Sequence, residues 1–141
     1  MNQKLDILPI QKFRELELII LFCFDFQSEI QKDELLDFIT LELKVAKRHV
    51  RDALHKVEEI QKQLDMLDAA ISQVSTSYDL KRINYVERAI LRLGVFELHV
   101  VKKLDPAIVI AEAKRLARKF STAEAAAFCQ ALLNATITKT S

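Results

Sequence analysis

The chain contains one glycine and two prolines in 141 residues, and this scarcity limits its folds more than any other feature. Turns that need a positive φ are mostly built with glycine, so folds rich in β-hairpins are disfavoured. Phosphate-binding loops of the P-loop and dinucleotide types each need at least two glycines close together. The single glycine, Gly94, lies inside a helical pattern of apolar residues. The sequence therefore predicts an all-α protein without a glycine-loop nucleotide site.

Apolar residues recur at spacings of three and four along most of the chain, which is the period of an amphipathic helix. Phe13, Leu16, Ile20 and Phe24 form one such stripe, and Pro9 fits the first turn of that helix. The pattern predicts about seven helices, at residues 9–26, 31–43, 44–63, 64–74, 84–103, 106–120 and 121–136, with a loop at 75–77. The short connections indicate a single domain over residues 1–141, made of helical subdomains at about 9–77 and 78–138.

Capping residues mark the helix starts in the C-terminal half. Asn84 followed by Glu87 fits a capping box, and Ser121 followed by Glu124 fits a second one. Asp105 supplies an N-cap, and Pro106 supplies a first-position proline, for the helix that begins at Pro106. The helix after Asn84 is apolar on two faces, which predicts a place in the middle of the bundle.

The residues that carry enzyme chemistry are sparse. The three histidines make no metal-binding spacing, and no serine lies in a nucleophile-elbow context. Cys23 and Cys129 stand far apart among apolar neighbours, which favours buried free thiols in a reducing cytosol. The longest apolar run has seven residues, too few to span a bilayer. We expect a cytoplasmic, soluble protein that is not an enzyme and has no cofactor or metal.

Positive charge gathers in the C-terminal half, which permits a polyanionic partner. Residues 80–141 carry eleven Lys and Arg against five Asp and Glu. Four basic residues share the spacing of one helix face; they are Lys44, Lys47, Arg48 and Arg51. Arg118 and Lys119 precede the last helix, whose free N–H groups suit a phosphate, and Phe128 is a candidate for stacking a base. A solvated helix face and a core phenylalanine are the more common explanations of such residues, so the residues alone predict no more than an all-α domain able to bind RNA or another protein.

The C-terminal half resembles the NusB family of bacterial transcription antitermination factors. The resemblance runs from about residue 79 to 136 through INYVERAILRLGVFEL at 83–98, AIVIAEAKRLARKF at 107–120 and STAEAAAFCQALLNA at 121–135. The N-terminal half matches more loosely, through Arg14-Glu15 and Leu21-Phe22. The resemblance implies a compact all-α bundle of two helical subdomains with no catalytic activity.

The resemblance also implies partners and site residues. NusB-like proteins pair with a small-subunit ribosomal protein, NusE, and the pair binds boxA-type single-stranded RNA within the transcription elongation complex. This promotes processive transcription, notably of ribosomal RNA operons. By position, the residues expected to bind RNA are Lys12, Arg14, Arg118, Lys119 and Phe128, and those expected to bind the partner protein are Phe22 and Glu87.

The chain departs from the family pattern at the N-terminus. The family has several arginines there, whereas residues 10–14 keep only Lys12 and Arg14. Because each lost phosphate contact lowers affinity, we expect weaker RNA binding than in a typical member, with basic residues at 44–51 or 114–119 as compensation. The alternative is a protein-interaction module that keeps the fold and has lost RNA binding. The apolar face of the first helix fits either internal burial or a two-fold homodimer.

Overall fold

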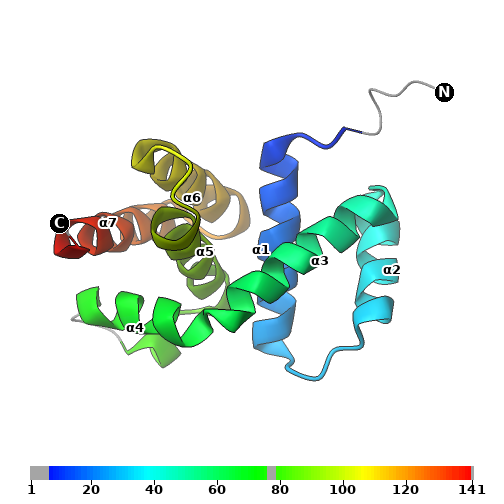
Figure 1. Cartoon of the computed structure of the whole chain (residues 1–141), viewed down its shortest axis with the longest axis horizontal. Helices are drawn as coiled ribbons and strands as arrows, with labels where there is room; N and C mark the ends of the chain where they lie inside the picture. Colours follow the sequence, from blue (N-terminus) through cyan, green and yellow to red (C-terminus); the bar gives the residue numbers. More distant parts are fainter. Residues whose placement is uncertain (1–6, 76–78, 141) are drawn as a thin grey trace. The chain divides into compact units, whose positions relative to one another are not determined.

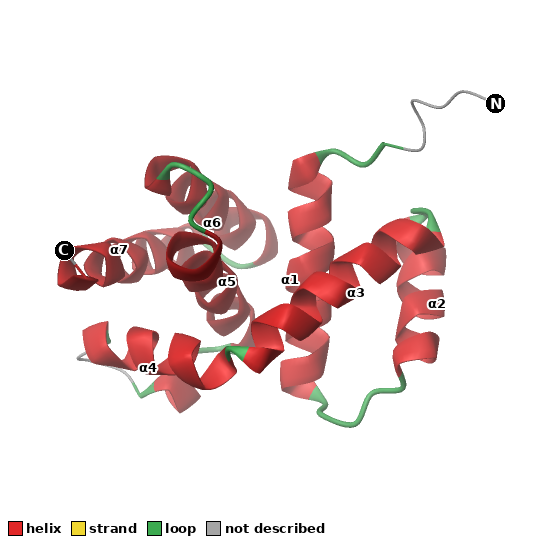
Figure 2. Cartoon of the chain, viewed as in Figure 1, coloured by secondary structure: helices red, strands yellow, loops and turns green. Residues whose placement is uncertain are grey.

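The computed structural model describes residues 7–75 and 79–140, and every regular element in them is helical (Figures 1 and 2). The α-helices are α1 (Ile10–Phe26), α2 (Lys32–Leu43), α3 (Lys47–Lys62), α4 (Leu64–Val74), α5 (Tyr85–Phe96), α6 (Pro106–Phe120) and α7 (Ala123–Thr140). A 3₁₀ turn, η2 (Leu80–Arg82), precedes α5, and a π-helical segment, η3 (Glu97–Val101), follows it. The predicted all-α class is confirmed. Most of the predicted loop at 75–77 lies outside the described residues.

The chain divides into two compact units, Met1–Glu59 and Ile60–Ser141, with the boundary inside α3. Within the second unit, α4 contacts both α5 and α7. The sequence-based division near residue 77 differs from this one in where it places α4. No helix in the described parts of the chain is long and apolar enough to cross a membrane.

The first unit contains α1, α2 and most of α3. The apolar stripe of α1 is largely buried, with Leu16 and Ile20 fully inaccessible, and Val50 of α3 is equally buried. Lys47 Nζ lies 2.8 Å from Asp37 Oδ1, and Lys32 pairs with Glu58, so ion pairs link α2 to α3. These pairs are exposed and add little to stability, because water screens them.

The predicted helix over 44–63 is wrong at its start. Lys44 ends α2 in the left-handed conformation, with φ 53°, and α3 begins only at Lys47. A residue in this conformation commonly terminates a helix. Lys44 therefore does not share a helix face with Lys47, Arg48 and Arg51.

The second unit is built around α5, which contacts α4, α6 and α7. Eight consecutive residues of α5, from Ala89 to Phe96, are buried, so the prediction of a central helix is confirmed. A Cβ atom added at Gly94 would lie 2.9 Å from both Cδ atoms of Leu133 on α7. Arg92 Nε donates to Asp68 Oδ1 at 2.8 Å and Arg92 Nη2 donates to Asp68 Oδ2 at 2.9 Å, which joins α5 to α4.

The predicted caps hold at two of three helix starts. The Glu87 N–H donates to Asn84 Oδ1 at 2.8 Å, and the Ala107 N–H donates to Asp105 Oδ1 at 2.9 Å. At α7 the predicted cap on Ser121 is wrong. Thr122 Oγ1 accepts the Ala125 N–H at 3.0 Å, while Ser121 is the C-cap residue of α6. Because α7 begins at Ala123, Thr122 is its N-cap, and an N-cap side chain accepts from the N–H two or three residues later.

Candidate nucleic-acid interface

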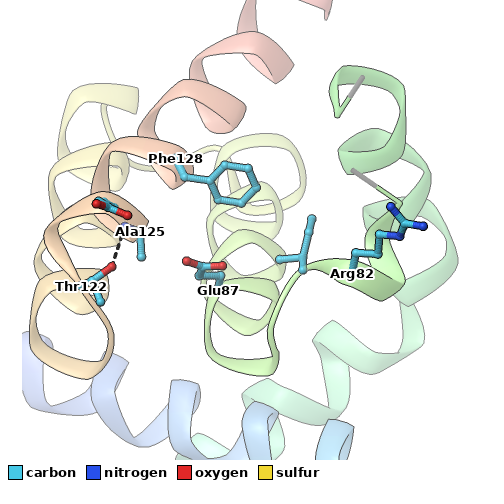
Figure 3. A pocket seen from close by; sticks show the side chains of 7 residues that line it. Arg82, Glu87, Thr122, Ala125 and Phe128 are labelled. Carbon is cyan, nitrogen blue, oxygen red and sulfur yellow. Dashed lines mark hydrogen bonds between the residues drawn. The ribbon is translucent and has the colours of Figure 1, made fainter. Parts of the chain in front are cut away.

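A hollow in the second unit opens where η2, α5 and α7 meet, and Figure 3 shows its side chains. Its volume is about 260 Å³. The residues that line it are Arg82, Ile83, Glu87, Thr122, Glu124, Ala125 and Phe128. The ring of Phe128 and the carboxylate of Glu87 both point into the same space (Figure 3). We call this feature the Phe128 hollow.

Local hydrogen bonds hold one wall of the Phe128 hollow. The Asn84 cap begins α5 and places Glu87 in its first turn. Arg88 Nη1 donates to the carbonyl oxygen of Leu80 at 3.2 Å, which ties η2 to α5. Arg82 at the end of η2 is exposed, whereas Ile83 is buried, so the wall has an apolar base and a cationic edge.

The opposite wall comes from the start of α7. The Thr122 cap, drawn as a dashed line in Figure 3, fixes the first turn of this helix. Phe128 follows about one and a half turns later, given 3.6 residues per turn, and its side chain is partly exposed. An aromatic ring in this position can accept a stacked base, because every base offers a π face.

Burial alters the titration of two groups beside this hollow. Desolvation raises the pKa of Glu87 above its ordinary value. The pKa of Cys129 is raised to about 12, first by desolvation and then by the negative charge of Glu87. Cys129 is fully buried and Cys23 partly so, and both are free thiols, as expected.

Two cations stand at the corner between α6 and α7. Arg118 and Lys119 lie in the last turn of α6 and are exposed. Lys119 Nζ lies 5.7 Å from the centroid of the Phe120 ring, a cation–π distance. Arg115, one turn earlier, pairs with Glu112 at 2.9 Å. The exposed cations precede Thr122, so the first turn of α7 adjoins both this corner and the Phe128 hollow.

The site residues expected in the first unit lie on α1. Lys12 Nζ is 3.9 Å from Glu15 Oε1. Arg14 is only 5% exposed, which leaves its guanidinium little surface to offer a phosphate. The Phe22 ring stacks on that of Phe26, with centroids 5.9 Å apart, and Phe26 is 65% exposed. The stacked pair therefore offers an accessible aromatic surface.

The structure brings together residues that the sequence assigned to different partners. Phe128 was expected to bind RNA and Glu87 a protein, yet both line one hollow. Sequence reasoning missed Arg82 and Thr122 at the same place. Arg82 stands two residues before the Asn84 cap, a position in which its direction depends on the η2 turn. In the described part of the chain, no group of three or more His, Cys, Asp or Glu side chains could hold a metal ion.

Comparison with known proteins gives a consistent family. The profile of the NusB family matches residues 11–138. The transcription antitermination protein NusB of Chlamydia pneumoniae is 35% identical over 133 residues, which cover 94% of this chain and 82% of that protein. NusB of Nitratiruptor sp. is 37% identical over 123 residues, covering 86% of each chain.

Solved structures agree with this match. The fold superimposes with a TM-score of 0.77 on a crystal structure of antitermination factors NusB and NusE in complex with dsRNA, at 25% identity over 92% of this chain and 96% of the other. It superimposes equally well, with a TM-score of 0.77, on NusB of T. maritima, at 26% identity over 92% and 90% of the two chains. The family profile spans nearly the whole sequence, and both relatives exceed 30% identity over most of their length. The chain belongs to the NusB family.

Proposed function

We propose that this protein is an antitermination adaptor that binds boxA-type single-stranded RNA together with the small-subunit ribosomal protein NusE. In this role it joins the transcription elongation complex and promotes processive transcription of ribosomal RNA operons. The observation that carries the proposal is the family match over residues 11–138. It is supported by the fold match to a NusB chain that was crystallised with NusE and dsRNA.

The chemistry of the second unit supports an RNA surface. Arg118 and Lys119 are exposed cations at the α6–α7 corner, and phosphates are the groups that such cations attract. Phe128 supplies a partly exposed ring on the adjacent helix. Sites for single-stranded nucleic acid usually combine cations along the phosphate backbone with an aromatic ring on which a base stacks. The adaptor acts by positioning its partners, without a covalent step.

The stacked rings on α1 support a protein surface. Phe22 and Phe26 lie in one stack, and the outer ring is largely exposed. Aromatic side chains are enriched among the anchors of protein interfaces. We assign Phe22 to the surface that binds the NusE-type protein.

The test of the RNA surface is a double substitution with a matched control. Arg118→Ala with Lys119→Ala removes two charges at the corner, and Lys56→Ala with Lys62→Ala removes two exposed charges from α3. RNA affinity is measured over a salt series. The corner variant should bind more weakly and lose about 1.4 units of the slope of log affinity against log salt, because single strands give about 0.7 per phosphate contact. Equal salt slopes for the corner variant and the α3 control would show that Arg118 and Lys119 do not belong to the RNA site.

The small number of N-terminal cations and the burial of one of them favour a second function. Residues 10–14 carry only Lys12 and Arg14, and Arg14 is buried. These observations fit a protein-interaction module that has kept the fold without RNA binding. Absence of RNA binding at the lowest salt, together with intact binding of the NusE-type protein, would establish this second function.

A further inference from the structure

We infer that the Phe128 hollow is a pocket for a single guanine base, which stacks on Phe128 and donates two hydrogen bonds to Glu87. The inference rests on the RNA-binding function proposed above and adds a residue that selects the base. It starts from one juxtaposition. A carboxylate from α5 and an aromatic ring from α7 point into the same space (Figure 3).

The composition of the hollow favours a base over a phosphate. Among the described residues that line it, Glu87 and Glu124 carry carboxylates and Arg82 carries a guanidinium. Carboxylates repel a phosphate at close range, whereas they accept hydrogen bonds from a neutral base. At about 260 Å³ the hollow is slightly smaller than pockets for drug-sized ligands, which begin near roughly 300 Å³. This size suits one planar ring system.

The acceptor chemistry of Glu87 then selects among the four bases. An ionised carboxylate has two acceptor oxygens and no donor. Guanine alone presents two adjacent donors on its Watson–Crick edge, at N1 and at the N2 amino group. Adenine and cytosine each place a ring-nitrogen acceptor beside the amino group, and uracil flanks its one N–H with two carbonyls. A carboxylate facing those edges would therefore meet a lone pair, so Glu87 should favour guanine.

The surroundings of Glu87 fit this role. The Asn84 cap fixes the backbone N–H of Glu87, so the carboxylate projects from a defined first turn of α5. The side chain is partly buried next to Ile83, and a partly dry site strengthens each hydrogen bond. Arg82 is exposed at the edge, where its charge can face the phosphate of the same nucleotide.

The experiment replaces guanosine by inosine, which lacks the N2 amino group. Dissociation constants are measured for a boxA-like single strand and for the same strand with every guanosine replaced by inosine. The wild-type protein should bind the guanosine strand about tenfold more tightly, which is typical of one good base contact. Glu87→Gln should bring this ratio close to one, since an amide offers one acceptor oxygen instead of two. Circular dichroism checks that the variant is folded.

Two further variants separate base selection from general effects. Glu29→Gln removes the same charge from the loop between α1 and α2, outside the hollow, and should keep the tenfold ratio. Phe128→Leu removes the ring and should weaken both strands by about tenfold, because stacking does not depend on the N2 amino group. The guanosine-to-inosine ratio should then stay at the wild-type value.

Each other outcome contradicts the inference in a distinct way. Equal affinities of the wild-type protein for both strands would exclude a guanine pocket and leave the proposed RNA binding intact. A tenfold ratio that persists in Glu87→Gln would exclude Glu87 as the acceptor. Loss of NusE-type binding in Glu87→Gln, with an unchanged ratio, would make the hollow a protein site. Absence of binding to either strand, even with the NusE-type protein present, would end both the inference and the proposed function.

Discussion

Gly94 shows how one missing side chain lets two helices pack. An added Cβ would lie 2.9 Å from both Cδ atoms of Leu133, which is fully buried, so the Leu133 side chain would have to shift within the core. We predict that Gly94→Ala lowers the free energy of unfolding by about 1–2 kcal/mol, because overpacking outweighs the roughly 1 kcal/mol that alanine gains in a helix. Urea unfolding monitored by circular dichroism measures this.

The control is the pair with Leu133. Leu133→Ala alone should cost about 2–5 kcal/mol through a cavity, whereas adding Gly94→Ala to it should cost nothing further or recover part of the loss. Strictly additive effects would show that the two residues are not in contact.

Cys129 should be inert to thiol reagents in the folded protein. It is fully buried and its pKa is raised to about 12, so almost no thiolate exists near neutral pH. Cys23 is partly exposed and should react first with an aromatic disulfide reagent. One fast thiol in the native protein and two in urea is the expected count. Rapid reaction of both thiols without denaturant would contradict the burial.

The same pKa predicts a loss of stability at high pH. The folded pKa lies above the unfolded value of about 9, so the unfolded chain releases the Cys129 proton first. The contribution of this thiol is therefore complete below pH 9 and declines as the pH rises toward 12. Cys129→Ser removes the thiol, so it should flatten this part of the curve of unfolding free energy against pH. A slope unchanged by the substitution would assign the decline to other groups.

Single-residue features were predictable from the sequence where they depend on neighbours along the chain. The caps at Asn84 and Asp105 follow from local spacing, and both form. The burial of Arg14 has no signal in the spacing of its neighbours, and the direction of Arg82 depends on the η2 turn, which the helical pattern did not predict.

The N-terminus of α7 depends on Thr122 as its cap. Thr122→Ala should lower the free energy of unfolding by about 1 kcal/mol, since the N–H of Ala125 loses its acceptor. Ser121→Ala is the matched control and should change stability by less than about 0.5 kcal/mol, because it removes no helix cap. Thermal unfolding of both variants compares them. A larger loss of stability for Ser121→Ala than for Thr122→Ala would show that Ser121 is the cap, as the sequence predicted.

The link between α4 and α5 depends on the bidentate pair of Arg92 and Asp68. The Arg92 side chain is 10% exposed and that of Asp68 is 25% exposed, so water screens the pair only in part. Asp68→Asn should cost about 2 kcal/mol, less than a fully buried pair, because the guanidinium loses its charged partner. Asp65→Asn, on the exposed first turn of α4, should be nearly neutral. Equal changes of the unfolding free energy for Asp68→Asn and Asp65→Asn, measured in denaturant, would show that the Arg92–Asp68 pair adds nothing to stability.

At the scale of elements, the apolar period predicted each α-helix because buried positions repeat along it. The breaks between helices were harder. Lys44 and Lys102 end helical segments with φ values of 53° and 58°, although glycine is the usual residue for that conformation. The π-helical turn at Glu97–Val101 also has no marker in the sequence, since its residues continue the apolar pattern.

For the chain as a whole, the family was readable from the sequence because its C-terminal motifs are contiguous. The Phe128 hollow was not readable from the sequence, because its residues come from the separate segments η2, α5 and α7.

The charge of the whole chain sets a further expectation. Positive charge is concentrated in residues 80–141, and the N-terminal stretch keeps few cations, so RNA affinity should be modest for the protein alone and fall as salt increases.

The central claim is that RNA and a NusE-type ribosomal protein bind this chain together. The most direct measurement is the dissociation constant for a boxA-like single strand at low and moderate salt, with and without that protein. The account predicts weak, salt-sensitive binding by the protein alone and tight binding when both proteins are present, because the partner adds contacts that the depleted N-terminus lacks. RNA affinity that does not change when the ribosomal protein is added would contradict it.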